Sequence, residues 1–308
     1  SVSRGLGDVY KRQPLMVKAS AGGGGRGIRL VEHPEDLEAA ITAAKQEALN
    51  FFGNDEVYME KFIVNPKHIE VQILADSYGN TVYLGERDCS MQRRNQKVLE
   101  ETPSPIMTPE LRAKMGKAAV AAAKACGYTN AGTIEFLVDA DRNFYFMEMN
   151  TRIQVEHPIT EAVTGIDLVK QQILIANGEK LPFAQEDITI RGHAIECRIN
   201  AENPALNFRP SPGQITALHI PGGPGIRVDS SAYQGYTIPP YYDSMIAKLI
   251  VHAPTREEAI AKMKWALAEF IVDGVDTNID FQLSLIRDSL FEKGTYDIGY
   301  LGRKLSGK

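Results

Sequence analysis

The sequence has few of the residues and patterns that mark secreted, membrane-spanning or nucleic-acid-binding proteins. Only three of its 308 residues are cysteines, and this odd number gives no disulfide framework, so a reducing cytoplasm is the expected environment. No apolar run approaches the roughly 18 residues that a membrane helix needs. The formal net charge is −5, whereas proteins held to nucleic acid by bulk electrostatics are normally basic. We therefore expect neither a membrane nor a nucleic-acid partner.

The composition is that of a soluble globular protein with a sizeable core. Hydrophobic residues make up 44% of the chain and charged residues 24%. Residues 1–13 are an exception, because they show neither an apolar period nor the layout of a signal peptide. Part of this segment, Asp8–Gln13, resembles a translated sequencing adapter, so we interpret 1–13 as a non-native leader; a natural leader is the alternative. The regular pattern of the chain begins at Pro14.

A glycine-rich loop between two short apolar strands is the first candidate site. Strands are expected at 15–18 and 28–31, with five glycines among residues 22–27 between them. Glycines let several backbone N–H groups turn toward one anion, and Lys18 adds a positive charge beside them. Neither Gly-Lys-Ser/Thr nor a helix follows, so the pattern is not a Walker A loop. It predicts a hairpin that covers phosphates; a flexible linker is the alternative.

The remaining pattern predicts a small α+β unit over residues 14–62 and longer elements after it. Pro34 fits a first helical position and opens an expected helix, with a strand to follow. Thr108 and Thr255 are expected to cap two further helices. The expected strands cover 57–63, 68–74, 80–84, 132–138, 143–149 and 192–199, and the expected helices cover 35–50, 108–126, 160–176 and 255–270.

Two acids and an amide within apolar strands form a candidate metal site. Glu148 and Asn150 share one face of their expected strand, and Glu135 lies in the preceding strand. Burying such groups is costly unless they bind a cation, and Mg²⁺ prefers these hard oxygen ligands together with nucleotide phosphates. Structural salt bridges are the alternative interpretation.

The segment that follows carries groups suited to a small oxyanion. Arg152 can bind a planar anion through two hydrogen bonds, Gln154 can add more, and Glu156 is suited to general-base work. We expect these three side chains on one strand face; an exposed strand edge is the alternative. Upstream, residues 86–97 contain four cations, which is typical of a solvated loop but could supply charge to anionic substrates.

Two weaker signals remain open. The strand end Glu60–Ile63 offers backbone groups beside an apolar residue, as an adenine site would, but an ordinary strand end fits at least as well. The histidines His68, His157 and His193 are better explained as packing or hydrogen-bonding residues than as ligands or bases. His68 is the best functional candidate of the three because it follows the Glu60–Ile63 segment.

Several segments together resemble the biotin carboxylase family of ATP-grasp enzymes. The resemblance rests on Met16–Gly27, Glu86–Arg94, Glu148–Pro158, Glu196–Glu202 and Pro239–Met245. It covers nearly everything from Pro14 to Lys308. The first segment also occurs, in looser form, in carbamoyl-phosphate synthetases, but the set as a whole is specific to the biotin-dependent group.

The resemblance implies an α+β, ATP-grasp architecture. A small lid would occupy residues 14–62, a larger mixed-sheet catalytic domain 63–188, and a biotin carboxylase C-terminal domain 189–308. The family also has an N-terminal domain, with a further ATP-contacting lysine, before the point where this chain begins. We expect that domain to be missing here.

The resemblance also implies roles for individual residues. The nucleotide would be bound by Lys18, Gly22, Gly23, Gly24, Gly25, Arg26, Gly27, Glu60, Lys61, Ile63, His68 and Gln92. The metal ion, Mg²⁺ or Mn²⁺, would be bound by Glu135 and Glu148 with Asn150 beside them. The bicarbonate pocket would be lined by Lys97, Arg152, Gln154 and Val155. Glu156 would deprotonate bicarbonate, and Arg198 would stabilise the biotin enolate.

The implied activity is ATP-dependent carboxylation of biotin by bicarbonate, through carboxyphosphate, on a biotin carboxyl carrier protein. This is the first half-reaction of acetyl-CoA carboxylase in fatty acid synthesis, with carboxyltransferase subunits as further partners and a homodimer expected at full length. No Met-Lys-Met attachment tripeptide is present, so the carrier would be a separate chain or lie beyond the end of this one. Asn95 departs from the family, which often has a histidine near the nucleotide at this position.

Three alternatives stay open on the sequence. Propionyl-CoA and pyruvate carboxylases contain the same unit. Another ATP-grasp carboxylate ligase is disfavoured by the Glu196–Glu202 motif and the matching C-terminal region. An inactive nucleotide-binding fragment is the third, and the bicarbonate dependence of ATP turnover would separate it from the enzymes.

Overall fold

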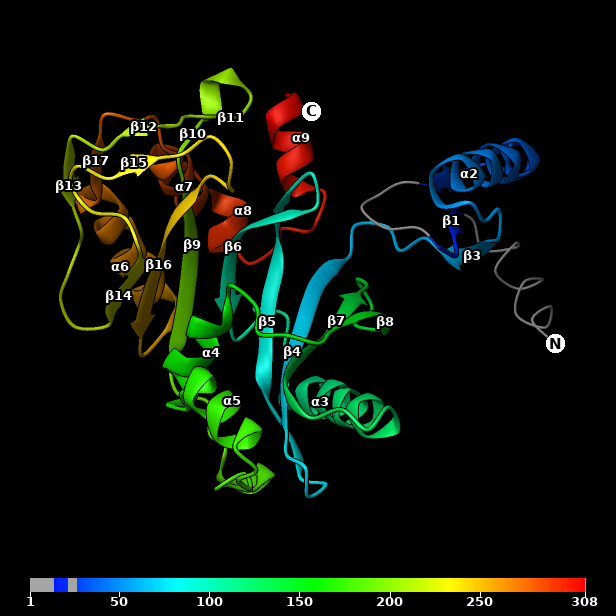
Figure 1. Cartoon of the computed structure of the whole chain (residues 1–308), viewed down its shortest axis with the longest axis horizontal. Helices are drawn as coiled ribbons and strands as arrows, with labels where there is room; N and C mark the ends of the chain where they lie inside the picture. The colour runs from blue at the N-terminus through cyan, green and yellow to red at the C-terminus, as the bar shows by residue number, and fades with distance from the viewer. Residues whose placement is uncertain (1–13, 22–26, 308) are drawn as a thin grey trace. The chain divides into compact units, whose positions relative to one another are not determined.

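The computed structural model describes residues 14–21 and 27–307. They form two compact units, one that ends at Val64 and one that begins at Asn65 (Figure 1). Residues on both sides of position 188 belong to the second, larger unit.

The smaller unit is a three-stranded antiparallel sheet with one helix. β1 (Leu15–Ala19) lies between β2 (Ile28–Val31) and β3 (Val57–Lys61). After a short 3-10 turn at Pro34–Asp36, α2 (Leu37–Phe52) packs its apolar side chains against those of β1. Alternation of buried and half-buried residues along β1 places one strand face in this core. Both strands of the expected hairpin are therefore confirmed.

The larger unit is organised around an eight-stranded sheet whose order is β14–β16–β9–β6–β5–β4–β7–β8 (Figure 1). Its strands are β4 (Lys67–Ala75), β5 (Thr81–Arg93), β6 (Gln96–Thr102), β7 (Asn130–Val138), β8 (Phe144–Asn150), β9 (His193–Asn200), β14 (Ile226–Ser230) and β16 (Met245–Ala253). The expected α+β class is confirmed. Every neighbouring pair is antiparallel, so the sheet is antiparallel rather than mixed.

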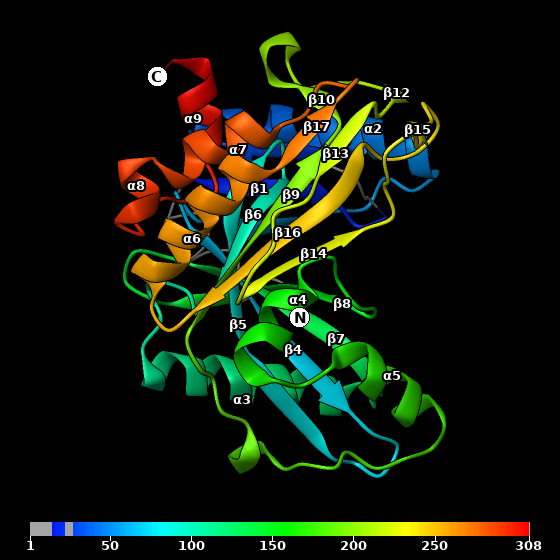
Figure 2. The same cartoon turned by 90° about the vertical axis from the view of Figure 1, so that its left-hand side faces the viewer.

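Helices cover both faces of this sheet. On one face, α3 (Pro109–Ala125) packs on β4 and β7, and α6 (Arg256–Glu269) packs on β9 and β16. On the opposite face, α4 (His157–Thr164) packs on β9 and β16, and α5 (Leu168–Ala176) packs on β4 and β7 (Figure 2). The ionisable side chains of the candidate site lie on the α4 face.

Local capping explains the helix limits, including one that differs from expectation. Thr108 and Thr255 cap α3 and α6 by accepting backbone hydrogen bonds, as expected. The single helix expected over 160–176 is instead two helices. Gly165, with a φ of +73°, ends α4, and the side chain of Asp167 caps α5.

The basic segment at residues 86–97 is not a solvated loop. It forms the end of β5, a tight turn at Arg94 and Asn95, and the start of β6. Both turn residues have positive φ, 51° and 64°. Arg87 within this segment is fully buried, so its charge must be balanced inside the protein.

A β-bulge changes which side chains of β6 face the site. Leu99 and Lys97 pair with consecutive residues of β5, which leaves Val98 as an extra residue. Such a bulge shifts the alternation of side chains between the two faces. Lys97 and Glu100 therefore point to the same face. There Lys97 donates directly to Glu156, and Glu100 is connected to Glu156 through Arg198.

Besides β14, β16 and α6, the described chain after β9 adds short strands and three more α-helices. The short strands are β10 (Glu202–Asn203), β11 (Arg209–Pro210), β12 (Gly213–Gln214), β13 (Ala217–His219), β15 (Thr237–Ile238) and β17 (Ile271–Asp273), and the helices are α7 (Ile279–Ile286), α8 (Ser289–Glu292) and α9 (Tyr300–Ser306). Helices α7 and α8 join α6 in one apolar core. None of the helices within 14–21 and 27–307 is long and apolar enough to cross a bilayer.

Candidate active site

A row of ionisable side chains crosses the larger sheet. Glu148 of β8 lies opposite Glu135 of β7, and Glu135 lies opposite Glu70 of β4. Glu70 in turn lies opposite Arg87 of β5. Side chains opposite one another on antiparallel strands approach to roughly 5 Å between Cβ atoms. Three acids in succession would repel one another, so the row requires nearby cations.

Lys97 supplies one of these cations. Its Nζ lies 2.6 Å from Glu70 Oε2, 2.9 Å from Glu135 Oε1 and 2.7 Å from Glu156 Oε1. Burial alone would lower the pKa of Lys97, but the surrounding carboxylates outweigh burial and hold this pKa far above its ordinary value. Lys97 is therefore a fixed cation among three acids.

Arg87 is a buried guanidinium that connects several elements. Its Nε donates to Glu70 Oε1 at 2.5 Å, and its Nη1 donates to Thr160 of α4 at 3.0 Å. Its Nη2 donates to Gln154 Oε1 at 3.1 Å, and Gln154 Nε2 donates to Glu135 Oε1 at 2.8 Å. One side chain thus fixes the segment before α4 against β4 and β5.

Glu156 lies between two cations. Lys97 donates to its Oε1, and Arg198 of β9 donates from Nη2 to its Oε2 at 3.0 Å. Arg198 also donates from Nε to Glu100 Oε1 at 2.7 Å. Nη1 of Arg198 has no hydrogen-bond partner within the described part of the chain, so this nitrogen is available to a substrate oxygen.

His68 and Gln92 are joined to an acid of the candidate metal site. Gln92 donates from Nε2 to His68 Nδ1 at 2.7 Å, which places the ring proton on His68 Nε2, 2.9 Å from Glu135 Oε2. Burial alone would raise the pKa of Glu135, but contacts with His68 and Lys97 hold it well below its usual range. Glu135 is therefore ionised at neutral pH.

The donors around Glu135 fit a hard divalent cation. Glu148 lies directly across from it, and Asn150 Nδ2 lies 3.0 Å from Glu135 Oε1. His68, Glu70 and Glu135 also bring potential ligand atoms within 4.8 Å of one another. Carboxylate and amide oxygens are the ligands that Mg²⁺ prefers. These residues can therefore hold the metal ion that the sequence suggests.

The structure gathers most of the residues expected in the site from the larger unit. The converging side chains are His68, Gln92, Lys97, Glu135, Asn150, Gln154, Glu156 and Arg198. Glu148 is exposed, although its strand position faces Glu135. Val155 contributes a backbone oxygen, which accepts from Lys248 Nζ at 3.0 Å.

Arg152 does not join this cluster. Residues 151–156 form a loop and a turn, so the expectation that Arg152, Gln154 and Glu156 share a strand face is wrong. The loop buries Gln154 and Glu156 but leaves Arg152 exposed, with Nη1 donating to the carbonyl oxygen of Ile153 at 3.2 Å.

The smaller unit contains the other expected nucleotide residues. Lys18 forms an ion pair with Glu60 between β1 and β3, and Lys61 ends β3. Ile63 is buried. Gly27 has a φ of +70°, and a Cβ there would lie 2.7 Å from a side-chain atom of β1, so glycine is required. The remaining loop residues, Gly22, Gly23, Gly24, Gly25 and Arg26, lie outside the described residues.

Four ionisable residues of the site were not predicted as site residues: Glu70, Arg87, Glu100 and Glu196. All four are fully buried within strands of the larger sheet. Charged side chains are almost never fully buried unless they are paired, and the partners of these four lie on other elements, so the sequence alone does not indicate their burial. The signal that could have identified them is a charged residue inside an otherwise apolar strand, the same signal that identified Glu135.

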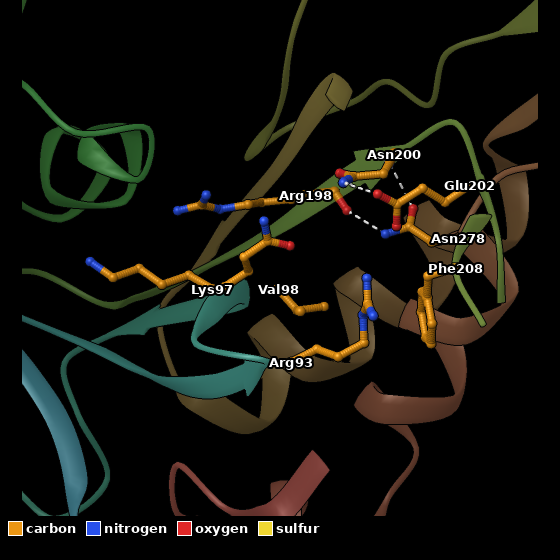
Figure 3. Close-up of a pocket in the computed structure, with 9 residues that line it drawn as sticks. Arg93, Lys97, Val98, Arg198, Asn200, Glu202, Phe208 and Asn278 are labelled. Atoms are coloured by element: carbon orange, nitrogen blue, oxygen red, sulfur yellow. Dashed lines mark hydrogen bonds between the residues drawn. The ribbon is translucent and has the colours of Figure 1, made fainter. Parts of the chain in front are cut away.

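A small pocket opens beside Lys97 and Arg198. Residues of β5, β6 and β9 line it together with Phe208 and Asn278. Figure 3 shows the side chains of Lys97 and Arg198 extending in the same direction from their strands. The carbonyl oxygen of Arg198 accepts hydrogen bonds from Asn278 and from Gln282 of α7, both at 2.9 Å. These two hydrogen bonds therefore hold the backbone of β9 in place at Arg198.

Comparison with known proteins identifies the family. Residues 10–184 match the family described as carbamoyl-phosphate synthase L chain, ATP binding domain, and residues 196–303 match the biotin carboxylase C-terminal domain. The chain belongs to the biotin carboxylase family. Biotin carboxylase 1 of Bacillus subtilis is 58% identical over 289 residues, which cover 94% of this chain and 64% of that protein. A pyruvate carboxylase subunit of Methanothermobacter thermautotrophicus is 57% identical over 281 residues, which cover 91% of this chain and 57% of that protein.

A solved structure of the biotin carboxylase family supports the fold. The biotin carboxylase domain of the Hydrogenobacter thermophilus 2-oxoglutarate carboxylase, in complex with MgADP, ADP and bicarbonate, matches with a TM-score of 0.88 and 50% identity. The match covers 98% of this chain and 67% of that chain. The ATP-grasp fold expected from the sequence is therefore confirmed. This chain spans less than two thirds of the length of either curated relative above.

Proposed function

We propose that this chain carries the reaction site of a biotin carboxylase, which uses ATP and bicarbonate to carboxylate biotin on a carrier protein. The observation that carries the proposal is Glu156, held between Lys97 and Arg198 on the sheet face that also bears Glu135. A base, two cations and a candidate metal ligand within hydrogen-bonding reach suit proton removal from an anion next to phosphoryl transfer. The ligands of the Hydrogenobacter thermophilus relative support the same chemistry.

In the first step, Glu156 takes the proton of bicarbonate. The oxygen that loses the proton attacks the γ-phosphorus of ATP, and the bond from that phosphorus to the bridging oxygen breaks, which gives carboxyphosphate and ADP. Lys97 balances the negative charge of the attacking anion, and Gln154 and the backbone N–H of Val155 donate to it. Arg152 would bind it only after leaving its contact with Ile153.

In the second step, carboxyphosphate breaks into CO₂ and phosphate. The phosphate takes the N1 proton of biotin, and N1 attacks CO₂ to give carboxybiotin. Negative charge that develops on the biotin oxygen is stabilised by Arg198 through its unpaired Nη1. Because Nε and Nη2 are already held by carboxylates, the guanidinium needs little reorganisation at that moment.

In this proposal the nucleotide and the metal ion are bound by the residues that the sequence suggests. Glu135 and Glu148, with Asn150 beside them, would hold Mg²⁺ or Mn²⁺, which would supply positive charge against the nucleotide phosphates. The proposed nucleotide contacts are Lys18, the glycine-rich loop, Glu60, Lys61, Ile63, His68 and Gln92.

The whole protein is proposed to serve acetyl-CoA carboxylase in fatty acid synthesis. Its partners would be a biotin carboxyl carrier protein and carboxyltransferase subunits, with a homodimer at full length and a cytoplasmic location. The 57% identity to part of a pyruvate carboxylase favours a second candidate, the same half-reaction in service of pyruvate.

The test is ADP release by the purified chain with Mg-ATP, with and without bicarbonate and free biotin. Turnover should require bicarbonate, rise with biotin, and fall by about 100-fold or more in Glu156→Gln, since a general base contributes at least that factor. Glu186→Gln, at an exposed position, is the matched control. Turnover that is indifferent to bicarbonate would contradict the proposal.

A binding measurement tests the metal site independently of turnover. Titration of the chain with ADP and Mn²⁺, followed calorimetrically, should give a dissociation constant at least 10-fold weaker in Glu135→Gln than in Glu186→Gln. Equal affinities in the two variants would remove Glu135 from the metal site.

A further inference from the structure

Two buried glutamates next to Arg198 have carboxyl oxygens without a hydrogen-bond partner among the described residues. Glu100 of β6 and Glu196 of β9 lie directly opposite one another in the strand register. Both are fully buried. Glu100 Oε2 and both oxygens of Glu196 have no hydrogen-bond partner within the described residues. Two adjacent buried carboxylates with three unpartnered oxygens between them would be strongly unfavourable if both were ionised.

The fourth carboxyl oxygen of the pair, Glu100 Oε1, is the one that has a partner, Arg198. It accepts from Arg198 Nε at 2.7 Å and lies 2.6 Å from Arg198 Nη2. Glu100 therefore already acts as the anion that fixes Arg198, and its other oxygen is free to receive a proton shared with Glu196. A carboxyl–carboxylate hydrogen bond would satisfy two of the three unpartnered oxygens at once.

We propose that Glu100 and Glu196 hold one proton between them at neutral pH and that this protonated pair positions the Arg198 guanidinium for the reaction. The inference rests on the proposed role of Arg198 in stabilising biotin. Glu100 and Glu196 are positioning residues, because they act through Arg198 and do not touch the reacting atoms. Sharing a proton leaves a single negative charge beside Arg198 on this side, with Glu156 on the other.

The surroundings of the pair support this charge state. Burial raises the pKa of Glu100 to about 7, and burial together with the charge of Glu100 raises the pKa of Glu196 well above its ordinary value. Two strands contribute cations besides Arg198, namely Lys97 from β6 and Lys248 from β16.

Among the described residues, a third carboxylate and apolar side chains also face the pair. Glu156, from the loop before α4, adds a negative charge that favours retention of the proton. Helix α4 packs on this part of β9 and β16 through apolar side chains, including Ile159 and Val163. The low polarity of that cover makes ionisation of both carboxyls still less favourable.

Ionisation of both glutamates would weaken the stabilisation of biotin by Arg198. If Glu196 also lost its proton, Arg198 would face two carboxylates on the sheet side in addition to Glu156. The guanidinium would then be held more strongly by the protein and would have less attraction left for charge that develops on biotin. The shared proton therefore tunes how firmly Arg198 is held, as well as where it lies.

Infrared spectroscopy tests the protonation directly and needs no turnover. At pH 7.5 the wild-type chain should show the C=O stretch of a protonated carboxyl group, shifted in deuterated water. Glu196→Gln, the neutral isostere of the protonated acid, should lose this band, whereas the exposed control Glu186→Gln should keep it. A band that is absent from the wild type, or unchanged in Glu196→Gln, would overturn the proposal.

Thermal denaturation gives an independent check with a defined sign. The folded-state pKa of Glu196 is raised, so its contribution to stability is present below its unfolded pKa and is lost as the pH rises. The melting temperature of Glu196→Gln relative to wild type should therefore increase between pH 5 and pH 8. A constant difference across this range would contradict a proton held by the pair.

Positioning of Arg198 is tested by NMR of the chain labelled with ¹⁵N-arginine, with Arg198→Lys used to assign the signal. The Nε proton of Arg198 should exchange slowly in wild type and in Glu196→Gln and at least 10-fold faster in Glu100→Gln. In the turnover assay, Glu100→Gln should lower the biotin-dependent kcat at least 10-fold with unchanged affinity for ADP. Slow exchange in Glu100→Gln would refute the positioning role, whether or not the chain turns over.

Discussion

Glu101 offers a quantitative test of the buried network on the face of the sheet opposite the candidate site. It is fully buried in β6. Its Oε2 accepts from His193 Nε2 and Arg256 Nε, each at 2.7 Å. Its Oε1 accepts from Arg256 Nη2 at 3.0 Å and from the Tyr296 hydroxyl at 2.7 Å. These bonds join β6, β9, α6 and the segment after α8.

The contribution of Glu101 to folding stability follows from the shift of its pKa. Burial alone would raise its pKa, but the bonds from His193 and Arg256 lower it from 4.5 to about 2. A difference of about 2.5 pKa units, at 1.36 kcal/mol each, corresponds to about 3 kcal/mol of folding stability. Because the folded-state pKa is depressed, this stability is present above pH 4.5 and is lost as the pH falls toward 2.

Glu101→Gln should therefore lower the free energy of unfolding by about 3 kcal/mol at pH 7 and by only about 1 kcal/mol at pH 3. Urea denaturation followed by tryptophan fluorescence measures this, because the only tryptophan of the chain, Trp265, lies in α6 of the same unit. Glu186→Gln should stay within about 0.5 kcal/mol of wild type. A loss below about 1 kcal/mol at pH 7, or one independent of pH, would refute the reasoning.

Three further substitutions test other parts of the fold. Arg87→Met should lower the free energy of unfolding by about 3–5 kcal/mol in urea denaturation, because it leaves buried partners without their guanidinium, and Arg87→Lys should not restore it. Thr108→Ala should cost about 1 kcal/mol, measured the same way, through loss of the α3 cap. Gly192→Ala should cost about 2 kcal/mol or more in thermal denaturation, because φ is +72° and its Cβ would lie 2.3 Å from the Ala253 carbonyl oxygen. Gly127→Ala, with a φ of +62° and open space around it, is the matched control and should cost only the backbone strain, about 1 kcal/mol.

Local sequence patterns predicted the elements whose limits depend on local chemistry. The strands on either side of the glycine-rich loop follow from short apolar runs, and α3 and α6 follow from their threonine caps. The division between α4 and α5 depended on local signals too. Gly165 and Asp167 are ordinary stop and start residues, but the apolar pattern continues across them and favoured one helix.

The parts that could not be predicted depend on pairing between distant strands. Period-two alternation places Lys97 and Glu100 on opposite faces, and only the bulge at Val98 brings them together. An extra residue at Met147 similarly shifts the pairing of β7 and β8 beside Glu148. A bulge has no strong sequence signal, because its position is fixed by how two strands meet.

The sequence also did not indicate which charged side chains are buried. Residues 86–97 contain enough cations to suggest a solvated loop, yet Arg87 is buried because Glu70 and Gln154 arrive from other elements to meet it. Arg152 shows the converse. It looked suited to the site by spacing, but the loop that carries it turns its side chain outward.

Two successive glutamates of β6 face opposite sides of the sheet, and their surroundings shift their pKa values in opposite directions. Glu100 faces the α4 side with a pKa of about 7, and Glu101 faces the α6 side with a pKa of about 2. Neighbouring residues of one type thus differ in acid strength by roughly 100,000-fold, since each pKa unit is a factor of ten. A change of pH between about 5 and 8 therefore spans the pKa of Glu100, while Glu101 stays ionised throughout. If Glu100 and Glu196 share a proton as proposed, that proton could be lost while the bonds of Glu101 continue to hold β6, β9 and α6 together.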